Sequence, residues 1–350
     1  MATGNLLDTY VIGFDRAIRE TVETKGGKLR QYVQRATGDL YRKEGVYQRT
    51  SGGGLPQKVT NRFGDSPVSD IGFSRRRTSR IAYQDGQFMD WADLSKMGVD
   101  PRNAKLNAMR NKFLRQEDII LDQAILGRAK GGDNGEDGVY LTDNANLLKD
   151  NGLLGSSTIA DGFTYEKFLG TLQSFGTNSV DIETETPIFK ITWNQWQDMM
   201  LDEQFINFDY TANRPIDRGV GAIYDYMGAK FCISNILPYF ADDSVTLGAD
   251  SGSETTVVPA DSELLLGDSN IDTTNGKWTS DSDGIRACYA FIQDAALLEV
   301  NPDMTTKISE RADKGFNYYA YMKAEFGAVR MEEEKVIVIP SKEGVATNSN

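Results

Sequence analysis

The 350-residue sequence contains no histidine. Histidine is the side chain that enzymes use most often for acid–base catalysis near neutral pH, and it is a frequent metal ligand. The sequence also lacks a P-loop, a GxSxG elbow, a CxxC pair, an HExxH motif and a GxGxxG that follows a strand. No residue is therefore nominated as a nucleophile, base or metal ligand, and we expect neither an enzyme nor a cofactor.

Long hydrophobic runs are absent too. No stretch of about 18 apolar residues occurs, which excludes a membrane-spanning helix. The N-terminus has no basic region followed by an apolar one, so we expect no signal peptide. Only two cysteines are present, Cys232 and Cys288, and both lie in apolar runs typical of buried strands. This placement predicts buried, reduced thiols rather than a disulfide, and hence a cytoplasmic origin.

Charge is distributed unevenly along the chain. Residues 1–130 contain 23 Lys and Arg against 15 Asp and Glu, a net charge of +8. Residues 131–350 contain 15 against 36, a net charge of −21, which gives the overall −13. An acidic chain repels phosphate backbones, so tight nucleic-acid binding over the whole surface is disfavoured. A basic front and an acidic back instead suit head-to-tail contacts between copies of the chain.

The most regular pattern predicts one long helix over residues 101–129. Asp100 occupies an N-cap position, Pro101 the first helical position, and the next helix-ending signal is the pair Gly131–Gly132. Such a helix is about 43 Å long. Its apolar residues fall on one stripe: Leu106, Met109, Phe113, Ile120 and Ala124. A helix of this length with one apolar side indicates the spine of a thin, plate-shaped protein.

Residues 55–95 are polar, rich in turn signals and β-prone, and we interpret them as a long hairpin that rests on a neighbour, since an isolated two-stranded ribbon is only marginally stable. This hairpin carries a cluster of four arginines: Arg75, Arg76, Arg77 and Arg80. Our favoured interpretation is ion pairing with the acidic surface of an adjacent subunit. A solvated run of charge and a contact with nucleic acid are the alternatives.

Later segments predict further helices and strands. A helix should begin at Thr164, and PIFKITW should form a buried strand that leads into a helix capped by Thr192 and Gln195. Residues 241–285 have the acidic, Ser/Thr/Gly-rich composition of a surface insertion. The acidic loops lack the ligand spacing of a calcium-binding loop, so we expect no metal site.

Three sequence blocks resemble a known family. The first is SRRRTSRIAYQDGQFMDWADLSKMGVDP with the long helix that follows it, ending DQAILGRAKGG. The second is YDYMGAKFCISNILP, and the third is TTKISERADKGFNYYAYMKAEFGAVRMEEEKVIVI. In this order they resemble the major capsid proteins of tailed bacteriophages with the Hong Kong 97-type fold. The acidic insertion is longer than the pattern of that family.

The resemblance implies an α+β fold of the Hong Kong 97 type, with an N-terminal arm, an extended β-hairpin loop, a peripheral domain with a long spine helix, and an axial domain. The implied divisions are an arm over 1–54, an extended loop over 55–95, a peripheral domain over 96–160 with spine helix 101–129, an axial domain over 161–302 with the insertion 241–285, and return strands of the peripheral domain with a C-terminal tail over 303–350.

The function implied is that of a major capsid protein, which self-assembles as pentamers and hexamers into the icosahedral head shell around double-stranded DNA. The expected location is the virion, after assembly in the host bacterial cytoplasm. Scaffold, portal and decoration proteins are the expected partners. The net charge predicts a shell that encloses DNA without sequence-specific binding.

Two other classes stay open at this point. The shell protein of a cellular encapsulin-like nanocompartment shares the implied fold, and an internal cargo-docking groove with an enzyme partner would distinguish it. An enzyme or a sugar-binding protein is the second alternative, and a purified monomer with saturable binding of a small molecule would favour it.

Overall fold

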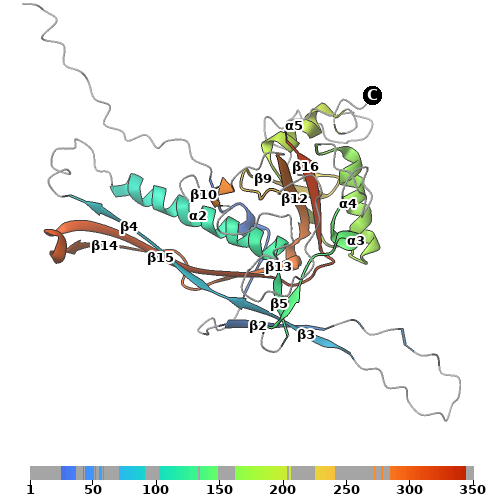
Figure 1. Cartoon of the computed structure of the whole chain (residues 1–350), viewed down its shortest axis with the longest axis horizontal. Helices are drawn as coiled ribbons and strands as arrows, with labels where there is room; N and C mark the ends of the chain where they lie inside the picture. Colours follow the sequence, from blue (N-terminus) through green and yellow to red (C-terminus); the bar gives the residue numbers. More distant parts are fainter. Residues whose placement is uncertain are drawn as a thin grey trace, which may run out of the picture.

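The computed structural model describes residues 25–36, 42, 44–50, 52, 55–56, 58, 71–90, 102–132, 135–148, 162–202, 205, 225–240, 271–272, 277–278 and 284–343. They form a long, thin plate, in which one helix lies along a sheet, and a compact part at one end of the plate (Figure 1). No helix in these ranges is both long and apolar enough to cross a membrane.

The spine of the plate is helix α2, Arg102–Leu126. Asp100 and Pro101, which we expected to start it, lie outside the described residues. The predicted end at residue 129 is wrong, because the chain leaves the helix at Gly127 and forms strand β5 over Ala129–Gly131. Gly132, with a φ of 77°, lies in the turn after β5 and ends no helix.

The sheet of the plate has the strand order β1-β13-β15-β14, and β4 also pairs with β15. Its strands are β1 Gln34–Arg35, β4 Ile81–Met89, β13 Ala296–Val300, β14 Thr305–Arg311 and β15 Asn317–Arg330. Alternate residues of β15 are buried, and Met322 and Phe326 share a core with Met109 and Phe113 of α2. The apolar stripe predicted on the helix therefore meets a strand with the matching two-residue period.

The compact part is built on a second sheet with the order β16-β12-β7-β9-β8. Its strands are β7 Pro187–Ile191, β8 Asp225–Tyr226, β9 Ala229–Ile233, β12 Ile285–Ile292 and β16 Val336–Lys342. Its helices are α3 Asp143–Asn146, α4 Tyr165–Thr177 and α5 Trp193–Leu201. The helix start predicted at Thr164 is confirmed, with the Thr164 side chain accepting a hydrogen bond from the Lys167 amide, and the predicted capping box of Thr192 and Gln195 is confirmed too.

Each sheet includes a strand from a segment expected in the other domain, so the boundaries of the peripheral and axial domains differ from the predicted ones. Residues 336–342, expected among the return strands of the peripheral domain, form β16 and pair with β12 in the compact part. Residues 296–300, expected in the axial domain, form β13 and pair with β15 in the plate. Pro340 is accommodated within β16 because that strand lies at the edge of its sheet.

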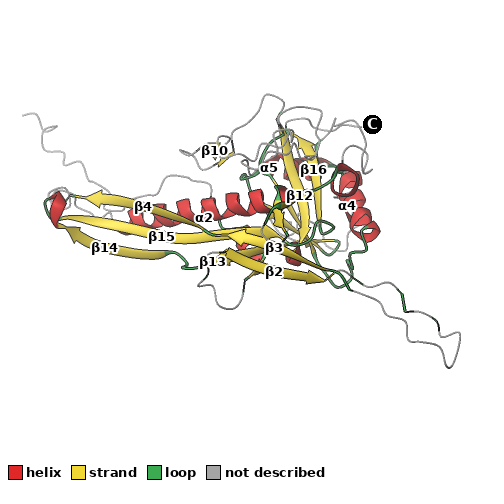
Figure 2. Cartoon of the chain, turned by 60° about the horizontal axis from the view of Figure 1, so that its bottom comes forward, coloured by secondary structure: helices red, strands yellow, loops and turns green. Residues whose placement is uncertain are grey.

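The ribbon starts earlier than predicted. Its two strands are β2, Glu44–Thr50, and β3, Phe73–Ser79, so the first lies inside the segment expected to be the N-terminal arm. β3 also pairs with β5 at two residue pairs, and β5 pairs with β6, Asp137–Val139. β4 follows β3 directly but pairs with β15 in the plate, so among the described residues the hairpin is formed by β2 and β3. Figure 2 shows β2 and β3 where the plate meets the compact part.

Short elements complete the description: the 3-10 helices η2 Leu29–Gln31, η6 Gln293–Ala295 and η7 Ala312–Lys314, and the strand pair β10 Ile271–Asp272 with β11 Lys277–Trp278. Both cysteines are free and buried, as predicted. Burial raises the pKa of the Cys232 thiol to about 11 and that of Cys288 to about 12.

The insertion 241–285 is not only a surface excursion. Most of it lies outside the described residues, but Trp278 is 4% exposed and belongs to the large core of the compact part. Ile285, at its end, is fully buried as the first residue of β12. Deletion of residues 243–282 would therefore remove a core side chain, although the composition of the segment predicts a surface insertion.

Trp278→Ala should destabilise the protein by about 3–5 kcal/mol, because truncating a buried Trp loses its burial and leaves a cavity. Urea unfolding followed by far-UV circular dichroism measures this loss. Trp193→Ala is the matched control, since that indole is 41% exposed and should cost far less. Equal losses from the two substitutions would show that Trp278 does not anchor the insertion.

Candidate functional site: a charged junction at the base of the ribbon

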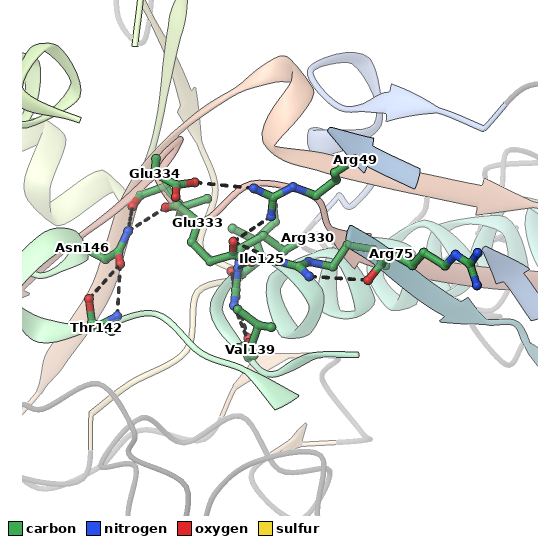
Figure 3. Close-up of polar contacts among 12 residues, drawn as sticks. Arg49, Arg75, Ile125, Val139, Thr142, Asn146, Arg330, Glu333 and Glu334 are labelled. Atoms are coloured by element: carbon green, nitrogen blue, oxygen red, sulfur yellow. Dashed lines mark hydrogen bonds and ion pairs between the residues drawn. The ribbon is translucent and has the colours of Figure 1, made fainter. Parts of the chain in front are cut away.

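The junction centres on Arg330, the last residue of β15, whose side chain is fully buried. Its guanidinium donates hydrogen bonds to the carbonyl oxygens of Ile125 at 2.8 Å, Gly127 at 2.5 Å and Val139 at 2.8 Å (Figure 3). A helix leaves its last carbonyl groups without partners. Arg330 thus caps the C-terminus of α2 and ties it to β6, and burial lowers its pKa to about 10.

Glu333, in the turn between β15 and β16, is shared by three arginines. Its carboxylate lies 3.0 Å from Arg49 of β2, 3.0 and 3.1 Å from Arg76 of β3, and 3.6 Å from Arg330. The neighbouring carboxylate of Glu334 is 3.9 Å from Arg49. One carboxylate therefore contacts both strands of the ribbon and the end of the plate.

The backbone of this turn is held from the opposite side by Asn146 of α3. The Asn146 side-chain amide donates to the carbonyl oxygens of Glu333 at 2.6 Å and Val336 at 2.8 Å. Its own oxygen accepts the Thr142 backbone N–H at 3.0 Å. Figure 3 shows Asn146 on one side of the turn and the arginines on the other. The turn joins the plate, the compact part and the ribbon.

The predicted arginine cluster divides between the two faces of β3 and the residue that follows this strand. Arg76 is 6% exposed and pairs with Glu333, whereas Arg75 is exposed. Arg77 pairs with Glu44 of β2 at 2.9 Å, and Arg80 donates to the carbonyl oxygen of Arg42. We expected all four side chains to reach an adjacent subunit, but Arg76 and Arg77 bind acidic partners within their own chain.

Sequence reasoning missed Glu333, Arg330 and Arg49. The alternation of exposed and buried residues along β3 could have assigned Arg76 to the inner face, since neighbouring residues of a strand point to opposite sides. No local signal connects Arg76 with Glu333, because the two residues are 257 positions apart.

A second group of buried charges lies on the middle of α2, where Glu117, Asp118 and Asp122 are fully buried. Asp122 accepts bonds from Lys190 of β7 at 2.6 and 2.8 Å, and from the Tyr289 hydroxyl at 2.7 Å. These contacts join the helix to the central strands of the compact part.

The other two carboxylates of α2 hold the N-terminal segment against the helix. Asp118 accepts the backbone N–H groups of Lys28 and Leu29, each at 3.3 Å. Arg30 lies 3.4 Å from Glu117 and 2.5 Å from Asp303. Burial raises the pKa of Glu117 to about 7, although the Arg30 charge opposes this, and raises the pKa of Asp122 to about 6 against the opposing charge of Lys190.

The buried charges of the junction and of α2 hold elements of the fold together. Among the described residues, no group of three or more His, Cys, Asp or Glu side chains is placed to hold a metal ion. Every buried carboxylate described above has a cationic, hydroxyl or backbone N–H partner, so these charges connect elements of the fold. The arrangement serves a structural role.

Comparison with known proteins agrees with this role. The sequence matches the phage capsid protein family over residues 6–343, and the chain belongs to that family. No curated protein matches it.

Solved capsid structures have the same fold at low sequence identity. The capsid of cyanophage Pam1 matches with a TM-score of 0.63 and 13% identity, over 99% of this chain and 100% of that chain. The capsid of cyanophage P-SCSP1u matches with a TM-score of 0.62 and 12% identity, over 95% and 93%. The capsid of Ralstonia phage GP4 matches with a TM-score of 0.59 and 13% identity, over 100% and 99%.

The fold is the mixed α+β fold of the Hong Kong 97 type. The protein is a major capsid protein, a structural protein that forms the oligomeric head shell of the virion.

Glu117→Gln should change how stability depends on pH. A carboxyl whose pKa is raised by folding stabilises the protein fully below its unfolded pKa, near 4.5, and that stabilisation is lost as the pH rises through about 7. The wild type should therefore lose stability between pH 5 and pH 8, and the Gln variant should lose less. Thermal unfolding at both pH values tests this. Equal losses in the two proteins would show that Glu117 titrates normally.

Proposed function

We propose that the β2–β3 ribbon is the extended loop through which one subunit lies over its neighbour in the shell. The observation that carries this proposal is the ribbon's attachment. Its backbone pairs with the body at two residue pairs between β3 and β5, and Phe73 at its far end is 73% exposed. An isolated ribbon of this kind is marginally stable, and a neighbouring subunit would supply the surface it lacks.

The same proposal assigns the remaining parts. The plate with α2 is the peripheral domain, and the compact part is the axial domain, which packs around the five-fold and six-fold centres as pentamers and hexamers. Arg75 and Arg80 contact acidic surface on the adjacent subunit, supported by the division of charge between the two parts of the sequence. Symmetry repeats each weak contact many times.

We further propose that the shell assembles in the host bacterial cytoplasm and encloses double-stranded DNA without sequence-specific binding, since the net charge of the chain is −13. Scaffold, portal and decoration proteins are the partners proposed for it. An encapsulin-like nanocompartment is the alternative, and an enzyme cargo inside purified shells would favour it.

Arg75→Glu/Arg80→Glu should reduce assembly without unfolding the subunit. Exposed ion pairs contribute only about 0.2–1 kcal/mol each. Reversing two charges in every subunit adds this cost once per subunit around a ring. Gel filtration and negative-stain microscopy measure assembly, and thermal unfolding confirms the fold.

Arg110→Glu/Lys314→Glu is the charge-matched control, because it makes the same change of charge on α2 and η7. It should assemble normally. Normal shells from Arg75→Glu/Arg80→Glu would refute the contact. If those shells form but do not fill with DNA, the two arginines contact the packaged DNA instead of a neighbouring subunit.

A further inference from the structure

The attachment of the ribbon has two separate points along β2. Near the base, Arg42 lies 3.3 Å from the buried carboxylate of Glu299, and the backbone at Gly45 packs against that same carboxylate. Further out, Arg49 reaches Glu333 at 3.0 Å. Gly45 and Arg49 are four residues apart, or about 13 Å along an extended strand.

Two points of attachment hold the ribbon in one direction relative to the body, whereas a single point would let the ribbon rotate about it. The backbone ladder between β3 and β5 consists of two residue pairs, Arg76 with Gly131 and Arg77 with Lys130. A ladder of two residue pairs therefore amounts to nearly a single point of attachment. The outer attachment at Glu333 is therefore the one that decides how the ribbon is aimed.

Glu333 suits this task because it is itself held firmly. Its side chain is 14% exposed, so its hydrogen bonds with Arg49 and Arg76 are charge-assisted and poorly screened by water. Its backbone carbonyl accepts from Asn146, as Figure 3 shows. Without this carboxylate, the cations of Arg49, Arg76 and Arg330 would lose the anion that they share.

We propose that Glu333 is a positioning residue for shell assembly: by binding Arg49 and Arg76 together, it sets the direction in which the ribbon leaves the subunit and reaches the next copy. This inference rests on the proposed function of the ribbon. Glu333 touches no neighbouring subunit in this role and acts through the two ribbon strands.

Glu333→Gln in the full-length chain tests the proposal, because it removes the charge and keeps the shape. In unassembled subunits, amide hydrogen exchange in 44–50 and 73–79 should become about tenfold faster, while exchange in α2 and β12 stays unchanged. In assembly reactions the variant should give fewer closed shells and a broader distribution of diameters. Glu334→Gln is the matched control, since Glu334 is 57% exposed and 3.9 Å from Arg49, and it should change neither readout.

Unchanged exchange in the ribbon strands would overturn the positioning role and leave the proposed function of the ribbon standing. Faster exchange with normal shells would overturn both, because a loosened ribbon would then be irrelevant to assembly. If Glu333→Gln fails to fold, Arg49→Met removes only the β2 side of the contact and should accelerate exchange in the same two strands. Normal exchange in Arg49→Met would then overturn the positioning role.

Discussion

The buried guanidinium of Arg330 is the interaction on which the rest of the structure depends. It binds two carbonyl groups at the end of α2 and one of β6, so the plate, the helix and the ribbon sheet meet at one side chain. A buried charge is tolerable only when its hydrogen bonds are satisfied. The three carbonyl groups and the Glu333 carboxylate are the partners of this buried charge. The elements of the junction must therefore keep the positions in which these contacts form.

The carboxylates of α2 extend the same principle along the spine. Asp122 joins the helix to Lys190 and Tyr289 in the compact part, and Asp118 holds the N-terminal segment by its backbone N–H groups. The helix thus adds polar contacts with the compact part and the N-terminal segment to its apolar contacts with the plate. A subunit with a thin plate gains from such directed contacts, because they fix orientation as well as contributing stability.

The elements that could be predicted from the sequence are those with a local cause. The periodicity of residues 102–126, the N-cap at Thr164 and the capping box at Thr192 act over one or two turns, and the three helices begin or run where expected. The end of α2 could not be placed, because the group that caps it, Arg330, lies about 200 positions away. The first ribbon strand was missed for a similar reason: its partner follows a long intervening segment, and its own sequence, EGVYQRT, is mostly polar.

The candidate site was predicted only in part. The arginine cluster marked the right strand, but its division into an inner and an outer face required the register of β3. Glu333 sits in the run EEEK, where three consecutive acids give no indication of which one pairs with the ribbon. The residues that matter most at this site are those that orient one element relative to another. Their partners lie far away along the sequence, and such pairings leave no pattern in a single sequence.

The stability of Arg330→Met relative to the wild type is the measurement that tests this account most directly. Arg311→Met serves as the control, since its exposed ion pair with Asp313 should contribute little. Removing the buried guanidinium leaves three carbonyl groups without that donor and takes one of three cations from Glu333, so urea unfolding should show a loss of about 3–5 kcal/mol. Hydrogen exchange should accelerate at the C-terminal turn of α2, in β6 and in the ribbon strands together. A variant as stable as the Arg311→Met control, with exchange unchanged in those three elements, would contradict the central role of Arg330.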